Sequence, residues 1–162
     1  MVIFAVLLSG YYLFVLKPKL ELPKARSEAQ RVLRLHSSNL TSNRLSYVQL
    51  TRLDPDSSDF LTAKSNLVGS LQSTQKAGTE LVEKESKIPD IDAKLTKDFP
   101  TLLTDTKQFF KDQEILLKEV YQTSSYQGGV KILKSDKALE LLTRQTNLLL
   151  QFQFWQDKLV PS

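Results

Sequence analysis

Apolar positions recur every three or four residues along most of the chain, which is the period of an α-helix with one buried face. The pattern predicts helices over 20–53, 60–88, 90–120 and 135–159, with Pro89 ending the second and Ser135 or Asp136 capping the last. Pro100 should kink the third helix or begin a new one. Alternating strand patterns are nearly absent, so we expect an all-α fold: an elongated antiparallel bundle of about four amphipathic helices.

Two segments interrupt the helical pattern. Residues 54–59 are rich in turn formers, and 121–134 is expected to be the only long non-helical segment, with Gly128 and Gly129 giving it freedom. Several polar residues nevertheless fall on the apolar stripes. The stripe of the first helix comprises Ala25, Ala29, Val32, His36, Leu40, Asn43, Tyr47 and Leu50, and that of the third comprises Leu102, Leu103, Thr106, Phe109, Phe110, Gln113, Leu116, Leu117 and Val120.

The last predicted helix is apolar on more than one side. One stripe comprises Leu141, Leu148, Phe152, Trp155 and Leu159, and a second comprises Leu139, Leu142, Leu150 and Phe154. One neighbouring helix cannot cover both stripes. Either this helix is central in the bundle, or one face is left for a protein partner or for self-association. Leu139, Leu142, Leu150 and Phe154 are therefore the candidate partner-binding residues.

An uncharged, mostly apolar segment opens the chain at residues 2–16. As a helix of roughly 15 residues it would rise about 22 Å, less than the roughly 30 Å of a hydrocarbon core, so it needs the flanking Lys17 and Lys19 to snorkel. It could be an uncleaved signal anchor, a cleaved signal peptide or an apolar core helix. The next residues lack a small-x-small cleavage site, which favours the anchor. We expect a membrane anchor with its basic flank over 1–19 and a helical bundle domain over 20–162.

Basic residues cluster directly after this segment. Between Lys17 and Leu53 there are eight basic residues and two acidic ones, whereas acidic residues slightly outnumber basic ones beyond Leu53. The positive-inside rule taken literally places the body in the cytoplasm. A start codon assigned too late would have removed an upstream basic region, however, and we favour a single-pass protein of the cell membrane with an extracytoplasmic body.

The basic stretch has two further interpretations. It could contact anionic lipid, or it could be a solvated helix face. Nucleic acid is a weaker partner, because aromatic residues are not interleaved with the basic ones.

The residues that usually carry catalysis or hold a metal are scarce. The chain has no cysteine, and its one histidine, His36, lies on an apolar stripe, which is typical of a core residue. A calcium-binding loop that started at Asp54 would also need a glycine and a glutamate at fixed positions, and the sequence has neither there. Helix capping explains the presence of Asp54, Asp56 and Asp59 without a metal. Gly128-Gly129 lacks the rest of a phosphate-binding loop. We therefore expect no enzyme activity, no cofactor, no metal and no small-molecule substrate.

The function that fits these features is a membrane-anchored, non-enzymatic helical scaffold or adaptor. It would contact the bilayer through 2–16 and a protein partner, or itself, through the last helix. The alternative is an extracytoplasmic helical bundle that binds or senses a small ligand, although such sensors normally return to the membrane through a second span. A third hypothesis is a tether that uses the basic residues from Lys17 to Arg52.

Overall fold

The computed structural model describes residues 17–54, 57–122 and 126–160, and every regular element within these ranges is a helix. The all-α prediction is therefore confirmed. The helices are α2 (Lys17–Thr51), α3 (Phe60–Lys84), α4 (Ala93–Gln122), α5 (Tyr126–Leu133) and α6 (Asp136–Lys158).

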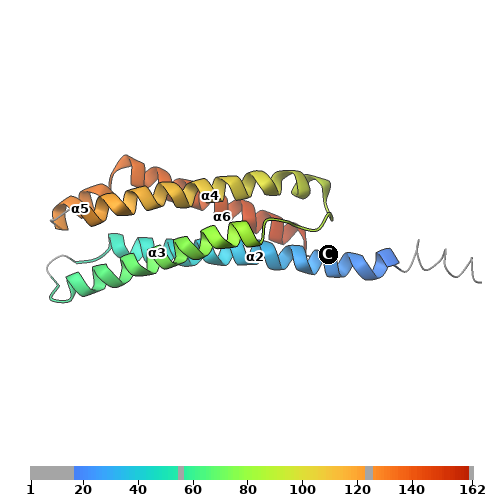
Figure 1. Ribbon diagram of the computed structural model, residues 1–162, viewed down its shortest axis with the longest axis horizontal. Helices are drawn as coiled ribbons and strands as arrows, with labels where there is room; N and C mark the ends of the chain where they lie inside the picture. The colour runs from blue at the N-terminus through green and yellow to red at the C-terminus, as the bar shows by residue number, and fades with distance from the viewer. Residues whose placement is uncertain (1–16, 55–56, 123–125, 161–162) are drawn as a thin grey trace, which may run out of the picture.

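The four long helices form an elongated antiparallel bundle (Figure 1). α2 lies beside α3, α3 beside α4, α4 beside α6, and α6 returns to the side of α2. The short α5 contacts α4 and α6. We call the end of the bundle with the start of α2 and the finish of α6 the N-terminal end, and the opposite end the α5 end. The first turns of α2 extend beyond the other helices at the N-terminal end (Figure 1).

Pro100 lies inside α4 and neither begins a new helix nor ends one. The helix begins after Asp92, whose Oδ1 accepts the backbone N–H groups of Lys94 and Leu95, both at 2.9 Å. Buried side chains precede and follow the proline, namely Leu95, Phe99, Leu102 and Leu103. Because both halves bury their apolar stripe in one core, packing offsets the hydrogen bond that proline cannot donate. Pro23 likewise lies inside α2, which begins at Lys17 and not at Leu20.

The prediction of a non-helical segment over 121–134 is wrong. α4 continues to Gln122, and α5 places Gly128-Gly129 within a helix. Glycine costs a helix about 1 kcal/mol relative to alanine. Here Leu133 and Gly129 line a small apolar cavity together with Val120 of α4, so contact with the rest of the bundle opposes that cost.

The predicted stripes form the core. In α2, every stripe position from Ala29 to Leu50 is buried, and so is the whole α4 stripe from Leu102 to Val120. The stripe of α6 from Leu141 to Leu159 is also buried. Helices with one apolar face each thus close around a single interior, as the sequence predicts.

Four polar side chains meet inside this core, one from each long helix, and we call them the amide cluster: Asn43, Thr74, Gln113 and Gln145. Asn43 Nδ2 donates to Gln113 Oε1 at 2.9 Å and to Thr74 Oγ1 at 3.1 Å. Asn43 Oδ1 accepts from Gln113 Nε2 at 2.9 Å and from Gln145 Nε2 at 2.8 Å. Asn43 therefore uses both donors and both lone pairs, and it is completely buried. The cluster satisfies polar groups that would otherwise destabilise the core.

We expect Asn43→Leu to lower the free energy of unfolding by roughly 2–5 kcal/mol, because Gln113 and Gln145 then lose their buried partner. Urea denaturation followed by circular dichroism measures the change. Asn66→Leu, at an exposed position on α3, is the matched control and should change stability by less than about 0.5 kcal/mol. Equal effects of the two substitutions would show that the amide cluster does not stabilise the bundle.

Two glycines in α3 provide a second test of the packing. A methyl group at Gly78 would overlap the ring of Phe110 and lie 2.5 Å from Asn39 Oδ1, whereas one at Gly69 would meet no atom within 4 Å. We expect Gly78→Ala to lower the melting temperature by several degrees, since overpacking costs about 1–3 kcal/mol. Gly69→Ala should leave it unchanged or raise it slightly, because alanine favours the helix. A rise for both variants would show that α3 does not approach its neighbours this closely.

The predicted membrane anchor over 2–16 lies outside the described residues. Within the described ranges, none of the helices combines the length and apolarity needed to cross a bilayer.

Candidate functional site

The candidate partner-binding residues lie on α6, whose start is set by a local signal. Ser135 is the N-cap and its side chain accepts the backbone N–H of Ala138 at 3.4 Å, in agreement with the predicted cap. From there one face of α6 is buried against α2 and α4. Gln145 joins this buried face through the amide cluster, so the rotation of α6 about its own axis is determined by contacts within the core.

This rotation brings three of the four predicted residues to the surface. Leu139, Leu150 and Phe154 are 54%, 57% and 56% exposed, whereas Leu142 is partly buried and packs against the core. Thr143 is also exposed. Residues at spacings of four, seven and four share one side of a helix. We call Leu139, Thr143, Leu150 and Phe154 the outer seam of α6.

Three charged side chains of α6 point elsewhere. Arg144 pairs with Asp112 of α4 at 2.8 Å, and Lys137 pairs with Glu119 of α4 at the same distance. Lys158 pairs with Asp92, just before α4, at 3.0 Å. These partners all belong to the α4 side, and exposed ion pairs of this kind contribute little stability. These three pairs direct charge toward α4, whereas the exposed Asp157 lies three residues after Phe154 on the side of the outer seam.

An uncharged band runs along the α2 and α6 side of the bundle. No charged residue occurs within 145–156 of α6 or within 35–43 of α2. The two segments lie side by side, because His36 stacks on Phe152 and Gln145 Nε2 donates to the Leu40 carbonyl oxygen at 3.2 Å. A quarter of all residues in this chain are charged, so two adjacent segments without charge are unusual, although the Arg44 guanidinium reaches Thr146 in the second of them.

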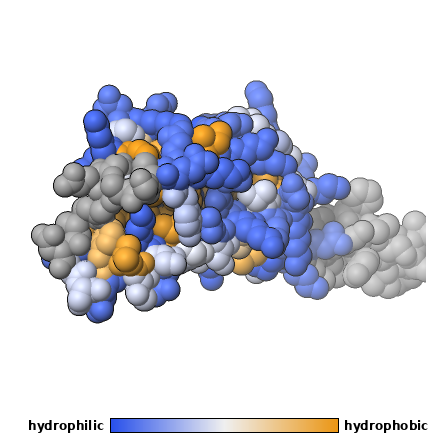
Figure 2. Space-filling view, turned by 60° about the vertical axis from the view of Figure 1, so that its left-hand side comes forward, coloured by the Kyte–Doolittle hydropathy of each residue, from blue (hydrophilic) through white to orange (hydrophobic). Residues whose placement is uncertain are grey.

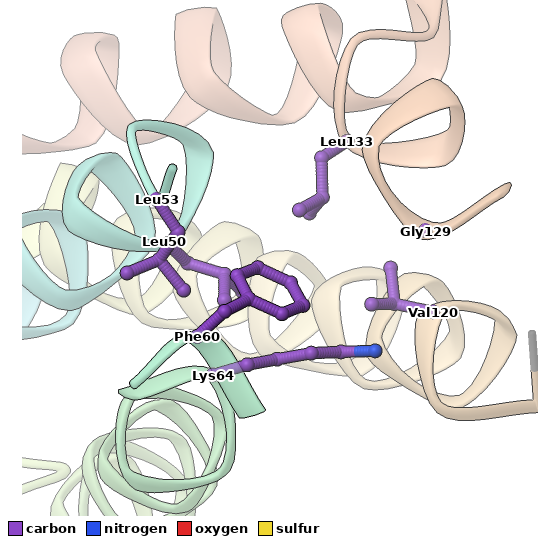
Figure 3. A pocket seen from close by; sticks show the side chains of 7 residues that line it. All are labelled: Leu50, Leu53, Phe60, Lys64, Val120, Gly129 and Leu133. Atoms are coloured by element: carbon purple, nitrogen blue, oxygen red, sulfur yellow. The ribbon is translucent and has the colours of Figure 1, made fainter. Parts of the chain in front are cut away.

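A small apolar hollow lies at the α5 end, between the start of α3, the second half of α5 and the ends of α2 and α4. Figure 3 shows Leu50, Phe60, Val120 and Leu133 around it, with the Lys64 ammonium group directed toward Val120. In Figure 2, where this end comes forward, apolar side chains gather beside an otherwise mostly hydrophilic flank. The volume of the apolar hollow is about 10 Å³, which corresponds to roughly one water molecule. The hollow is too small for a metabolite.

The basic residues of α2 are used in part within the bundle. Arg31 forms a two-point hydrogen bond with Glu28 and another with Glu85 beyond α3, at 2.7 to 3.2 Å. The Arg44 guanidinium donates to the Thr146 hydroxyl of α6. Lys24, in the first two turns of α2, is exposed. The stretch therefore divides into an interhelical part and a protruding part.

His36 is a core residue, as the sequence predicts. Its ring stacks on Phe152 with centroids 5.3 Å apart, meets Phe99 edge-on at 6.1 Å, and places Nε2 3.4 Å from the Glu85 carbonyl oxygen. Burial lowers the pKa of His36 below its ordinary value near 6.5, although the Glu85 carbonyl and carboxylate oppose the shift. The folded protein therefore holds His36 in its neutral form.

This lowered pKa predicts a loss of stability in mild acid. Below about pH 6.5 the unfolded chain binds a proton that the folded chain resists, so stability is complete above this pH and falls below it. His36→Phe preserves a ring against Phe152 and should remove this slope between pH 7 and pH 5 in thermal melts. The lowered pKa values of Glu28 and Asp92 act at lower pH. The same slope in wild type and variant would show that His36 does not cause it.

The remaining candidate sites find little geometric support. Asp54 and Asp59 are exposed, Asp56 lies outside the described residues, and no group of three or more His, Cys, Asp or Glu side chains in the described ranges is arranged to hold a metal ion. Asn39 opens a glycosylation motif, but its amide donates to the Thr74 carbonyl oxygen at 3.0 Å between two helices.

Comparison with known proteins adds no functional assignment: no family model, no curated protein and no solved structure matches this chain. Sequence reasoning named three of the four outer-seam residues, included Leu142, which packs against the core, and missed the pairing of the two uncharged segments. The signal was present as two runs free of charge, 35–43 and 145–156, which only the antiparallel arrangement of α2 and α6 brings together.

Proposed function

We propose that this protein is a single-pass, membrane-anchored helical scaffold without enzyme activity, which acts by protein contact through the outer seam of α6. Residues 2–16 would be the anchor, and the body would lie outside the cytoplasmic membrane. The observation that carries the proposal is the exposure of Leu139, Leu150 and Phe154 along one side of a helix whose opposite face is buried. Exposed apolar residues in one row mark contact surfaces more often than isolated ones do.

The size of the seam explains why an anchor would matter. Each of the three apolar side chains is about half exposed, so covering it contributes roughly 1 kcal/mol, and the three together contribute on the order of 3–4 kcal/mol. Association costs at least several kcal/mol of lost translational and rotational freedom, so this surface alone would hold two free molecules together only weakly. Confinement to one membrane raises the local concentration of both partners, which turns a weak contact into a populated one.

The small-ligand alternative has less support. The interior of the described bundle is filled by side chains, and the apolar hollow of Figure 3 has room for about one water molecule. The wider groove between α3 and α4 is open to solvent, and its lining combines the apolar Phe110 and Leu117 with charged and amide side chains.

We expect a photoreactive phenylalanine derivative at position 154 of the full chain to form a defined protein adduct in membranes of living cells. The same derivative at Ile115, an equally exposed apolar residue of α4, is the matched control and should form none. Deletion of residues 2–16 should release the chain from the membrane fraction and weaken the adduct. Gel electrophoresis after illumination measures both effects.

Two results would contradict the proposal. Equal adducts from positions 154 and 115, or none from 154, would show that the outer seam is not a contact surface. Recovery of the full chain in the soluble fraction would show that residues 2–16 are not an anchor.

A further inference from the structure

We infer that the groove between α3 and α4 is a further contact surface, which binds an acidic amphipathic helix of a partner protein. This groove is separate from the outer seam, because α3 and α6 lie at opposite corners of the bundle. The inference therefore does not depend on the proposed contact through α6.

Two hollows follow one another along the junction of α3 and α4 and form one groove. The larger has a volume of about 470 Å³ and lies between the second halves of the two helices, from Gln72 to Thr79 on the α3 side. The smaller, of about 120 Å³, continues toward the α5 end as far as Leu61 and Tyr121. From Leu61 to Thr79 the groove follows α3 for about 27 Å, or about five helical turns. A helix of ordinary length fits such a groove.

The two helices touch beneath the groove, so it cannot close by their moving together. The buried Gln75 donates from Nε2 to the Phe110 carbonyl oxygen. The Phe110 ring lies so close to Gly78 that a methyl group at Gly78 would overlap it. Phe110 and Leu117 line the floor and are themselves almost completely buried. The groove therefore exists before a partner arrives, and binding requires no rearrangement of the core.

The rim of the groove is basic. Lys118 pairs with Glu114 at 2.8 Å, and Lys76 lies 4.0 Å from Glu80 with both side chains mostly exposed. In the part of the chain that the structure describes, the two other lysines of the lining have no ion-pair partner. A ligand in the groove therefore meets an excess of positive charge. The charged residues of the lining are Lys64, Lys76, Lys111, Lys118 and Glu114.

The excess of lysine arises from the distribution of acidic residues. No aspartate or glutamate occurs from Phe60 to Thr79. Two acids of α4 pair across the other side of that helix, Asp112 with Arg144 and Glu119 with Lys137, and both of these bases belong to α6. α4 thus turns these acids toward α6 and its lysines toward a part of α3 that has no acid to neutralise them.

Charge and shape together indicate the chemistry of the occupant. Acidic side chains of a helix would pair with lysines of both walls, and its apolar face would lie on the lysine stems and on Leu61 and Tyr121, which are 76% and 53% exposed. A flat bilayer cannot reach a floor that lies between two helices. A nucleic acid would place phosphates against Phe110 and Leu117 and beside Glu114. An acidic amphipathic helix matches both the groove and its charge.

A synthetic helix tests the inference on the full chain, purified in a neutral detergent. The probe is a labelled peptide of about 18 residues with leucines along one face and glutamates beside them. We expect it to form an adduct with a photoreactive phenylalanine derivative in place of Gln72, which is exposed and lines the groove. The derivative in place of Asn66, exposed on α3 outside the groove, is the matched control and should form none. A scrambled peptide of the same composition keeps the charge without the apolar face and should also form none.

Charge reversal within the groove should weaken this binding. Lys76→Glu combined with Lys111→Glu should lower the adduct yield roughly tenfold at low salt, because attraction becomes repulsion at two positions. Lys97→Glu combined with Lys134→Glu changes the net charge equally at exposed positions outside the groove, and should change the yield by less than about twofold. Circular dichroism should be the same for both variants, since all four lysines are exposed.

Each result supports or overturns the inference. An adduct at position 72 that needs the apolar face of the peptide and the two groove lysines supports it. Equal adducts from the scrambled peptide would overturn the helix in favour of any acidic chain. Displacement of the probe by a lower concentration of an oligonucleotide, or of anionic lipid vesicles, would overturn the protein partner in favour of nucleic acid or a membrane. Equal losses in the two charge variants would show only long-range attraction, and equal yields at positions 72 and 66 would show that the groove binds no acidic helix.

Discussion

The arrangement of the four long helices depends on one completely buried side chain. Asn43 makes four hydrogen bonds to residues of the other three helices, at 2.8 to 3.1 Å. Sliding one helix by a turn would move its apolar stripe into equivalent grooves at little cost, but it would leave buried amides unpaired. In helical assemblies, the best-attested role of a buried polar residue is to select one register among several. The amide cluster thus selects which residues of α6 face outward.

Two consequences for the surface follow from this register. The ionic side chains Lys137, Arg144 and Lys158 meet acids on or beside α4. The opposite side of α6 meets no helix and carries Leu139, Leu150 and Phe154 beside an uncharged part of α2. The exposed apolar row and the core are therefore two faces of one helix, held at a constant angle by Gln145. The proposed scaffold function would place a weak apolar contact on this rigid element.

The errors in the sequence-based prediction have a common physical origin. Gly128 and Gly129 favour a loop locally, yet α5 forms because Leu133 and Gly129 pack against the ends of α2, α3 and α4. Pro100 favours a break locally, yet α4 continues because Phe99 and Leu102 share one core. In both places a local preference of a few kcal/mol is opposed by burial that involves distant parts of the chain. The pattern of a single sequence shows the local preference of glycine or proline, but it does not show which distant residues will bury the segment.

The sequence by itself determined the helical class, the stripes that form the core, the cap at Ser135, and the second apolar stripe of α6, because each depends on residues within a few turns of one another. Only the tertiary structure decided that Leu142 turns toward the core while Leu139, Leu150 and Phe154 remain exposed. It also decided that Asn43, Thr74, Gln113 and Gln145 meet, and that two uncharged segments more than 100 residues apart form one band. These features depend on the register between helices, which periodicity leaves open because it is the same after every turn.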